Sequence, residues 1–419
     1  MPYFGSYISS SGAQAILRHK YKGSDDSLVL KYVTNPIYEK IVVLFPTWVA
    51  PNLITVAGLL FTAISHALLA YYAPGLKDDP SNPVPSWVYF YSSVAVLAYQ
   101  ALDAMDGKQA RRTKSGSALG LLMDHGCDAV NTTVMSLSLS TALQLGGTLN
   151  AALVSGVAAL GFFFATLEEY YTGELHLPII NGPNEGIHIM SAVLFLTGWF
   201  GPSFWTAPAS SFGCTRGEVV MWTSVVFGLI TCLSNFYNIF FAVREKRTEI
   251  ENEKVQVRAE VESNTLSVAV TRALPLFLTL AFSYTWVVHS PSNIMARYPR
   301  TLLWVLGLVM AKLVVGIMVA HLCEAEYHPF SKTIAVFLFL AFHAAAGCYM
   351  FPGEVEGRHE DLLLFEMAAL MIMSMTHMVA VLAHEVSSVL GIYVFIITRK
   401  RPKTAYIQRL LRPSFGKSE

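Results

Sequence analysis

Four aspartates are the residues in this sequence whose type and spacing best suit chemistry. Asp103 and Asp106 are three residues apart, and Asp124 and Asp128 are four apart. On a helix, residues at these spacings share a face, so each pair projects its carboxylates to one side. A short turn around residues 114–116 would fold the two helices back on each other. The sequence therefore predicts that the four carboxylates converge on one small volume.

Carboxylates gathered at the edge of apolar segments need cations, because taking each ion out of water costs several kcal/mol. Hard divalent metals prefer oxygen ligands, and two such ions about 3.5–4 Å apart can share bridging carboxylates. We predict two Mg²⁺ ions, with Mn²⁺ as a substitute, since no His or Cys ligand is required. A single acidic residue here would usually be a solvated helix end, but four at this spacing favour a metal site.

Positive groups and glycines lie beside the aspartates. Lys108, Arg111 and Arg112 place positive charge next to the predicted metals. Gly107 and Gly120 leave room for a flat ligand to approach the backbone. Metal ions together with fork-shaped guanidinium groups suit a diphosphate. These residues therefore predict a substrate that carries one.

The motif resembles the signature of the CDP-alcohol phosphotransferase family. Its pattern is matched in residue type and spacing at eight positions: Asp103, Asp106, Gly107, Ala110, Arg111, Gly120, Asp124 and Asp128. Residues 106–113 and 124–128, and Pro51-Asn52-Leu53-Ile54-Thr55, resemble the eukaryotic choline/ethanolamine phosphotransferase branch. Beyond residue 200 the resemblance rests on length and the number of apolar segments.

This resemblance implies transfer of phosphocholine or phosphoethanolamine from CDP-choline or CDP-ethanolamine to diacylglycerol, which releases CMP. The four aspartates would hold two Mg²⁺ ions on the diphosphate. The CMP and phosphate pocket would be formed by Asn52, Gly107, Ala110, Arg111 and Gly120. The resemblance also implies a homodimer in the endoplasmic reticulum or Golgi membrane, with the active site facing the cytosol and no nucleic-acid partner.

The reaction needs a general base to take the proton of the attacking hydroxyl. His125 is our first candidate, because it adjoins the metal ligands and titrates near neutrality. It could instead hydrogen-bond a ligand aspartate as an outer partner. Glu185 is the second candidate, by its matching position in the branch, although a carboxylate there could simply favour a helix N-terminus. Asp128 is the third.

Two other classes of protein carry acidic groups in membranes. A transporter would spread its charges along a route and would show repeat symmetry with broken helices, whereas here the acids cluster and we find no repeat. An intramembrane prenyltransferase also binds a diphosphate through Mg²⁺ and aspartates, but it lacks the Asp-Gly…Ala-Arg pairing. A phosphotransferase for another CDP-alcohol or another acceptor remains an alternative.

The elements that must position these residues are predicted to be membrane helices. The chain has 419 residues, is 53% hydrophobic and only 14% charged, and has a mean hydropathy of +0.46. Runs of about 20 apolar residues can cross a bilayer as helices. We expect an all-α integral membrane protein with about ten spans, at residues 51–73, 86–112, 116–146, 151–172, 186–200, 217–245, 267–289, 300–322, 331–350 and 361–398.

Lysines and arginines predict the orientation of these spans. With ten crossings, the basic groups near residues 18–22, 108–114, 244–247 and 399–403 all fall on one face, which is therefore predicted to be cytosolic. Residues 24–47 combine a capping pattern with apolar periodicity, and predict an amphipathic helix on the membrane surface. Five scattered cysteines without a CxxC pair indicate neither a disulfide framework nor a zinc site.

The predicted organisation has five parts. They are a cytosolic N-terminal segment (1–47), a catalytic transmembrane core (48–245) with the motif at 103–128, a charged cytosolic connector (246–266), C-terminal transmembrane helices for support or dimerisation (267–398), and a basic cytosolic tail (399–419). At the end of the fourth span, Tyr170 and Tyr171 favour an aromatic belt at the membrane surface. Alternatively, their rings could surround a quaternary ammonium.

Overall fold

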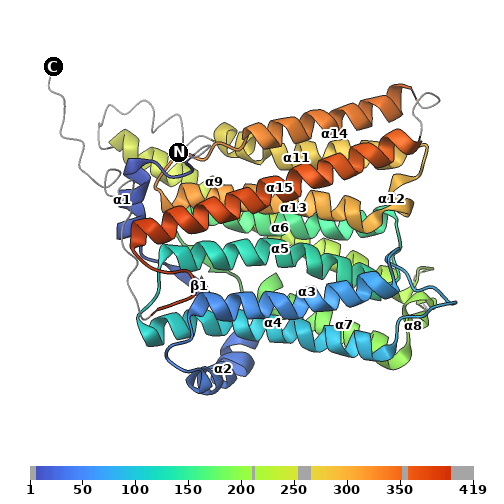
Figure 1. The fold of residues 1–419 in the computed structure, drawn as a ribbon, viewed down its shortest axis with the longest axis horizontal. Coiled ribbons are helices and arrows are strands. Elements are labelled where there is room, and N and C mark those ends of the chain that lie inside the picture. The colour runs from blue at the N-terminus through green and yellow to red at the C-terminus, as the bar shows by residue number, and fades with distance from the viewer. Residues whose placement is uncertain (1–5, 210–212, 253–265, 352–356, 398–419) are drawn as a thin grey trace.

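Long helices lie side by side along one axis in the computed structural model of this chain (Figure 1). The structure describes residues 6–209, 213–252, 266–351 and 357–397. The predicted basic tail, and residues 253–265 of the predicted connector, lie outside these ranges. The one sheet among the described residues has two strands.

Seven α-helices, three short η segments and two strands make up the described N-terminal half. The elements are α1 (Ser10–Arg18), β1 (Gly23–Asp25), η1 (Leu30–Thr34), α2 (Asn35–Ile41), η2 (Val42–Leu44), α3 (Pro51–Tyr72), α4 (Ser86–Thr113), α5 (Ala118–Ala142), α6 (Leu149–Thr172), β2 (Leu175–Leu177), η3 (Gly182–Gly186) and α7 (Ile187–Phe200). The rest of the described chain contains α8 (Ser203–Thr206), α9 (Arg216–Asn252), α11 (Leu266–His289), α12 (Ile294–Arg297), α13 (Pro299–Leu322), α14 (Lys332–Met350) and α15 (Gly357–Leu390).

A helix occupies each of the ten predicted segments, and the all-α membrane fold class is confirmed. Within the described residues, seven helices are long and apolar enough to cross a membrane: α3, α6, α9, α11, α13, α14 and α15. Helices α4 and α5, which carry the aspartates, and the 14-residue α7 are not among them. The number of ten crossings therefore stays a prediction.

One predicted boundary is clearly wrong. The last segment was expected to continue to residue 398, but α15 ends at Leu390. Gly391 follows with φ of +68°, a left-handed conformation that ends a helix and that glycine adopts at little cost. The chain then turns back, and the carbonyl of Val394 accepts a hydrogen bond from Asn52 Nδ2 at 2.9 Å.

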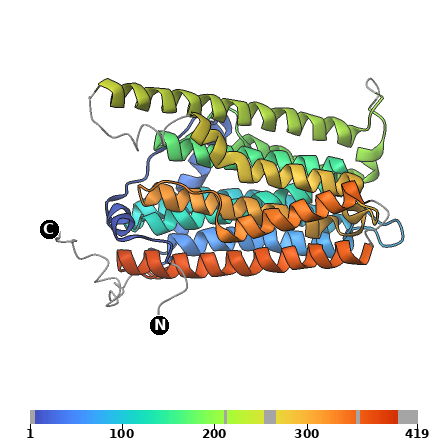
Figure 2. The same cartoon turned by 90° about the horizontal axis from the view of Figure 1, so that it is seen from above.

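Helix α13 is the centre of the bundle, and α9 lies at its margin. Within the apolar windows of the two helices, 72% of α13 is buried but only 17% of α9. Figure 2 shows α9 running along one edge of the molecule. Helix α13 approaches α5 closely at Gly307, which has no side chain. A Cβ at this position would lie 2.0 Å from Thr133 Oγ1, too close for two non-bonded atoms. The helix that carries Asp124 is thus held against the core.

The N-terminal segment is more complex than the single amphipathic helix predicted for residues 24–47. Residues 23–25 form β1, which pairs in parallel with β2, and residues 30–44 form η1, α2 and η2 in succession. Pro36 at the start of α2 has no N–H to continue the preceding helical turns. Helix α1 was not predicted. Apolar side chains such as Tyr32, Leu44 and Trp48 are exposed. The position of this segment on the membrane surface stays a prediction.

Candidate metal and phosphotransfer site

The turn between α4 and α5 positions the motif. Lys114 ends α4 in a left-handed conformation, and its backbone N–H donates to the carbonyls of the preceding turn. The side chain of Ser117 then caps α5 by accepting a hydrogen bond from Gly120 N at 3.2 Å. The chain reverses direction between α4 and α5, as predicted, at the end of the bundle where α1 and β1 also lie, and α3 packs against both helices (Figure 1).

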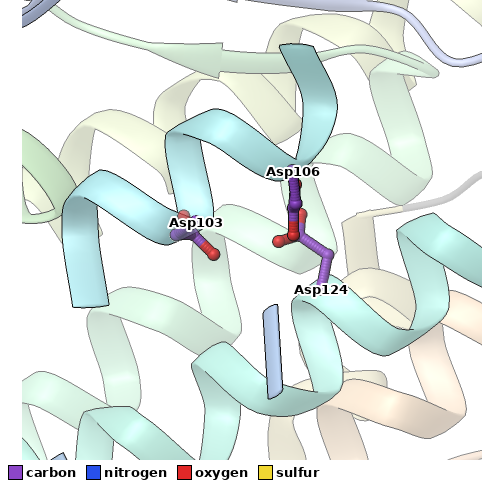
Figure 3. A group of neighbouring side chains, drawn as sticks. All are labelled: Asp103, Asp106 and Asp124. Carbon is purple, nitrogen blue, oxygen red and sulfur yellow. The ribbon is translucent and has the colours of Figure 1, made fainter. Parts of the chain in front are cut away.

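Three of the four aspartates converge. Asp103 and Asp106 project from α4 and Asp124 from α5 (Figure 3). One carboxylate oxygen of each lies within 4.8 Å of the others. Asp103 Oδ1 is buried and has no hydrogen-bond partner among the described residues. Three carboxylates offer hard oxygen ligands here, and one of their oxygens receives no hydrogen bond from the described residues. Such a group is chemically suited to a divalent cation.

Asp128 is outside the group of three carboxylates whose oxygens lie within 4.8 Å of one another. Its carboxylate accepts a hydrogen bond from the hydroxyl of Tyr99 on α4. Asp128 lies one helical turn after Asp124 on α5. Its role as a metal ligand stays a prediction.

Helix α3 completes the surroundings of the aspartates. The hydroxyl of Thr55 donates to Asp106, a contact that the sequence analysis did not identify. Asn52 is buried, and its Oδ1 would lie 3.6 Å from a Cβ placed on Gly120. The structure therefore brings Asn52 and Gly120 together, as the predicted pocket requires, although the amide of Asn52 also holds Val394.

The basic residues of the motif divide into two groups. Lys108 donates to Asn35 and lies 3.8 Å from Glu39, and Arg112 donates to the carbonyls of Val42 and Phe45 at 3.2 and 2.6 Å. These two side chains thus bind the N-terminal segment in the structure. Arg111 behaves differently.

The guanidinium of Arg111 packs over the position where Gly107 has no side chain. Arg111 Nη1 lies 3.6 Å from an ideal Cβ on Gly107. Arg111 is exposed at the same end of α4 as the aspartates. Among the basic residues of the motif, it is the one placed to meet an anionic ligand.

His125 lies between two carboxylates. Its Nε2 is 2.9 Å from Glu169 Oε2, and its Nδ1 is 3.8 Å from Asp124 Oδ2. Both His125 and Glu169 are buried. The sequence analysis missed Glu169, although an ionisable residue inside an apolar segment is a signal that could have identified it. These two carboxylates thus orient the imidazole ring, with Nε2 toward Glu169 and Nδ1 toward Asp124.

Glu185 lies in η3, directly before α7, and holds the N-terminal segment. Its Oε1 accepts hydrogen bonds from Ser27 Oγ at 2.6 Å and Val29 N at 3.3 Å, and its Oε2 accepts one from Asn181 N at 3.0 Å. Burial raises the pKa of the Glu185 carboxyl, but these hydrogen bonds outweigh it and leave the pKa below its usual value. Glu185 is therefore ionised at neutral pH.

The two tyrosines at the end of α6 already surround a cation of the protein itself. The guanidinium of Arg272 lies 5.2 Å from the ring centre of Tyr170 and 5.4 Å from that of Tyr171. Tyr171 is buried, so the aromatic-belt interpretation is wrong for this residue. Arg272 occupies the position that a quaternary ammonium was suggested to take.

Comparison with known proteins decides the family. A model of the CDP-alcohol phosphatidyltransferase family matches residues 48–230. Choline/ethanolaminephosphotransferase 2 of Arabidopsis thaliana is 33% identical over 397 residues, which cover 94% of this chain and 99% of that protein. The chain belongs to the CDP-alcohol phosphatidyltransferase family. Cholinephosphotransferase 1 of Danio rerio is 32% identical over 77% of the chain and 79% of its own length. Choline/ethanolaminephosphotransferase 1 of Saccharomyces cerevisiae is 30% identical over 79% and 83%, respectively.

As a CDP-alcohol phosphatidyltransferase, the chain is a multi-pass membrane enzyme of phospholipid biosynthesis. The family uses a divalent metal, and the three-aspartate group offers oxygen ligands for it. The region matched by the family model spans the whole hairpin of α4 and α5 together with Asn52 and Glu185. Most of the candidate residues therefore lie in the part of the chain that defines the family.

Proposed function

We propose that this enzyme transfers phosphocholine or phosphoethanolamine from CDP-choline or CDP-ethanolamine to diacylglycerol. The products are phosphatidylcholine or phosphatidylethanolamine, and CMP. The relatives named as choline or choline/ethanolamine phosphotransferases support this assignment over most of the chain. The observation that carries it is the three-aspartate group, which provides the metal ligands that transfer from a diphosphate requires.

Asp103, Asp106 and Asp124 are proposed to hold the metal, with Asp128 as a further ligand of a second ion. Mg²⁺ is the proposed ion, and Mn²⁺ its substitute, because the ligands are carboxylate oxygens. When bound, the metal neutralises the diphosphate and stabilises the charge of the departing CMP. Thr55 orients Asp106 through its hydroxyl, and Tyr99 orients Asp128.

The proposed pocket for CMP and the phosphates surrounds the hairpin. Asn52, Gly107 and Gly120 provide a wall of small and polar groups, together with Ala110. Arg111 supplies a guanidinium that can bind phosphate oxygens in a bidentate manner. Lys108 and Arg112 contribute positive charge at the edge of the site and keep the N-terminal segment attached to α4.

In the proposed reaction, the diacylglycerol hydroxyl attacks the phosphorus that bears the head group. A new P–O bond forms, the bond to the CMP oxygen breaks, and the hydroxyl proton moves to a base. We propose Glu185 as that base, because it is only half-buried and its neighbour Asn184 is hydrogen-bonded to Gln100 on the helix that carries Asp103. His125 is buried against Glu169 and adjoins Asp124, an arrangement that suits an outer partner of a metal ligand. Asp128 is engaged by Tyr99.

The proposed setting is the endoplasmic reticulum or Golgi membrane, with ten spans, the site on the cytosolic side and a homodimeric assembly. The clustering of basic residues at the end of the bundle that holds the aspartates supports the cytosolic orientation. The family resemblance supports the dimer.

The test is CMP release by the purified enzyme in lipid or detergent. CDP-choline and CDP-ethanolamine are each supplied with diacylglycerol, with and without Mg²⁺, beside an Asp124→Asn variant. The proposal expects release that depends on diacylglycerol and Mg²⁺ and that disappears in the variant. The ratio of the two donors identifies the preferred head group. Turnover with neither donor by a nucleotide-binding protein would indicate another CDP-alcohol or another acceptor.

A further inference from the structure

The segment that precedes α2 packs on the connection between α6 and α7. Strand β1 pairs with β2 in parallel, with Ser24 opposite His176 and Asp25 opposite Leu177. The backbone N–H of Asp26 adds a hydrogen bond to the carbonyl of Leu177 at 3.0 Å. Residues 23–29 are therefore fixed beside η3, the short helical segment that carries Glu185.

Polar side chains extend this contact to α4. The carboxylate of Asp25 accepts hydrogen bonds from the amides of Asn184 at 2.8 Å and Asn181 at 3.3 Å. Asn184 in turn accepts one from Gln100 Nε2 at 3.2 Å. Gln100 is three residues before Asp103, on the same helix. A continuous set of hydrogen bonds thus connects the N-terminal segment, η3 and the helix of the metal ligands.

Ser27 is the point where this segment contacts the proposed base. Its side chain is fully buried, at 0% exposure. Ser27 Oγ donates to Glu185 Oε1 at 2.6 Å and accepts from Leu30 N at 3.0 Å. The hydroxyl hydrogen is directed at the carboxylate because the oxygen lone pair already receives the N–H of Leu30. Ser27 therefore has one defined orientation.

We propose that Ser27 is a positioning residue for phosphotransfer, which holds the Glu185 carboxylate in its reactive orientation. The proposal rests on the function proposed above, in which Glu185 takes the proton of the acceptor hydroxyl. It makes the N-terminal segment a part of the catalytic site as well as a membrane-surface element. A carboxylate held by three donors from two segments loses rotamers, and a fixed base reacts faster than a mobile one.

Ser24 provides a matched control in the same strand. It is also a serine whose hydroxyl hydrogen-bonds a residue of the α6–α7 connection, His176 Nδ1, at 3.1 Å. That bond is exposed and does not involve Glu185. Removing either hydroxyl takes away one contact between the same two segments, but only one of them acts on the proposed base.

The experiment compares Ser27→Ala, Ser27→Thr and Ser24→Ala with the unaltered enzyme in lipid vesicles. We measure kcat, and the KM for CDP-choline and CDP-ethanolamine, by CMP release. Ser27→Ala should lower kcat about 10-fold to 100-fold, the range expected for a misplaced reacting group. Its KM for the nucleotide should change by no more than about twofold, because the metal and CMP pocket is intact. Ser27→Thr restores the hydroxyl and should recover most of kcat, and Ser24→Ala should behave as the unaltered enzyme.

A second comparison separates positioning from general support of the fold. In a Glu185→Asp background, the shortened carboxylate no longer reaches Ser27, so Ser27→Ala should have little further effect. Equal losses of kcat in both backgrounds, or equal effects of Ser27→Ala and Ser24→Ala, would overturn the inference while leaving the proposed function in place. Absence of turnover by the unaltered enzyme with either donor would overturn the proposed function and this inference together.

Discussion

A group of three half-buried carboxylates and one buried carboxylate lie at opposite ends of this bundle, and they have different partners. At one end is the three-aspartate group of α4 and α5. At the other end, Glu360 lies in the first turn of α15, which starts beside α12 (Figure 1). Glu360 is only 2% exposed, yet its two oxygens accept four hydrogen bonds, from Trp286 Nε1, Ser290 Oγ, Ser292 N and Cys348 Sγ.

The two groups differ in what neutralises their charge. Four donors from three segments surround Glu360, so its charge is stabilised by the protein itself. Asp103 has an oxygen without a donor among the described residues, and two more carboxylates lie beside it. Like charges in such a site oppose one another, and a cation removes both the repulsion and the missing hydrogen bond. A buried carboxylate with a full set of donors indicates structure, whereas one without them indicates a site.

The largest expected effect is on activity at the three-aspartate group. Asp103→Asn and Asp124→Asn should each reduce kcat about a thousandfold or more, because several kcal/mol of charge stabilisation by the metal is lost. Glu360→Gln should keep kcat close to that of the unaltered enzyme. CMP release measures both. A Glu360→Gln variant as inactive as Asp124→Asn would break the distinction between the two groups.

Glu185 is an intermediate case that sharpens the comparison. It has three donors, as a structural carboxylate would, but it is half-buried at the catalytic end. If Glu185 is the base, Glu185→Gln should lower kcat by a factor of about 10²–10⁴. His125→Asn should lose less, since that residue is assigned to support Asp124. A larger loss in His125→Asn than in Glu185→Gln would transfer the role of base to His125.

The sequence predicted those parts of the site that depend on spacing along one helix or across one short turn. Asp103, Asp106 and Asp124 converge as their spacing requires. The partners that fix the site are distant in sequence: Glu169 is 44 residues from His125, and Ser27 is 158 residues from Glu185. Such pairs depend on tertiary packing, which periodicity does not encode.

The same limit explains what the sequence did not predict about the N-terminal segment and its contacts with the motif. The apolar pattern of residues 24–47 predicted one helix, but residues 23–25 pair with β2 as β1 and the helical stretch covers residues 28–44. Lys108 and Arg112, whose role toward a diphosphate stays a prediction, donate hydrogen bonds to residues of this segment. Their charge was visible in the sequence, whereas the position of α2 beside α4 was not.

A smaller effect is expected on stability at Glu360. Glu360→Ala leaves Trp286 Nε1 and Ser292 N without their acceptor, and each buried donor left unpaired costs about 1–3 kcal/mol. The thermal midpoint in detergent should therefore fall, while kcat measured on the folded fraction is retained. Asp103→Ala should lower the midpoint less, because no hydrogen bond to Oδ1 is lost. An equal fall for the two variants would remove the structural contrast.

The smallest expected effect is the change in the thermal midpoint when Mg²⁺ binds. A ligand that binds only the folded state stabilises it by about 2.7 kcal/mol at a hundredfold excess over its Kd. Mg²⁺ should therefore raise the thermal midpoint of the unaltered enzyme and of Glu360→Gln by a few degrees, but not that of Asp124→Asn. In EDTA the order of the thermal midpoints should reverse. Asp124→Asn removes one of three mutually repelling charges, so the midpoint of this variant should equal or exceed that of the unaltered enzyme. If the midpoint of Asp124→Asn in EDTA were well below that of the unaltered enzyme, the carboxylate of Asp124 would be stabilised by the protein, as that of Glu360 is. The three-aspartate group would then be a structural cluster, and the metal would have to bind elsewhere.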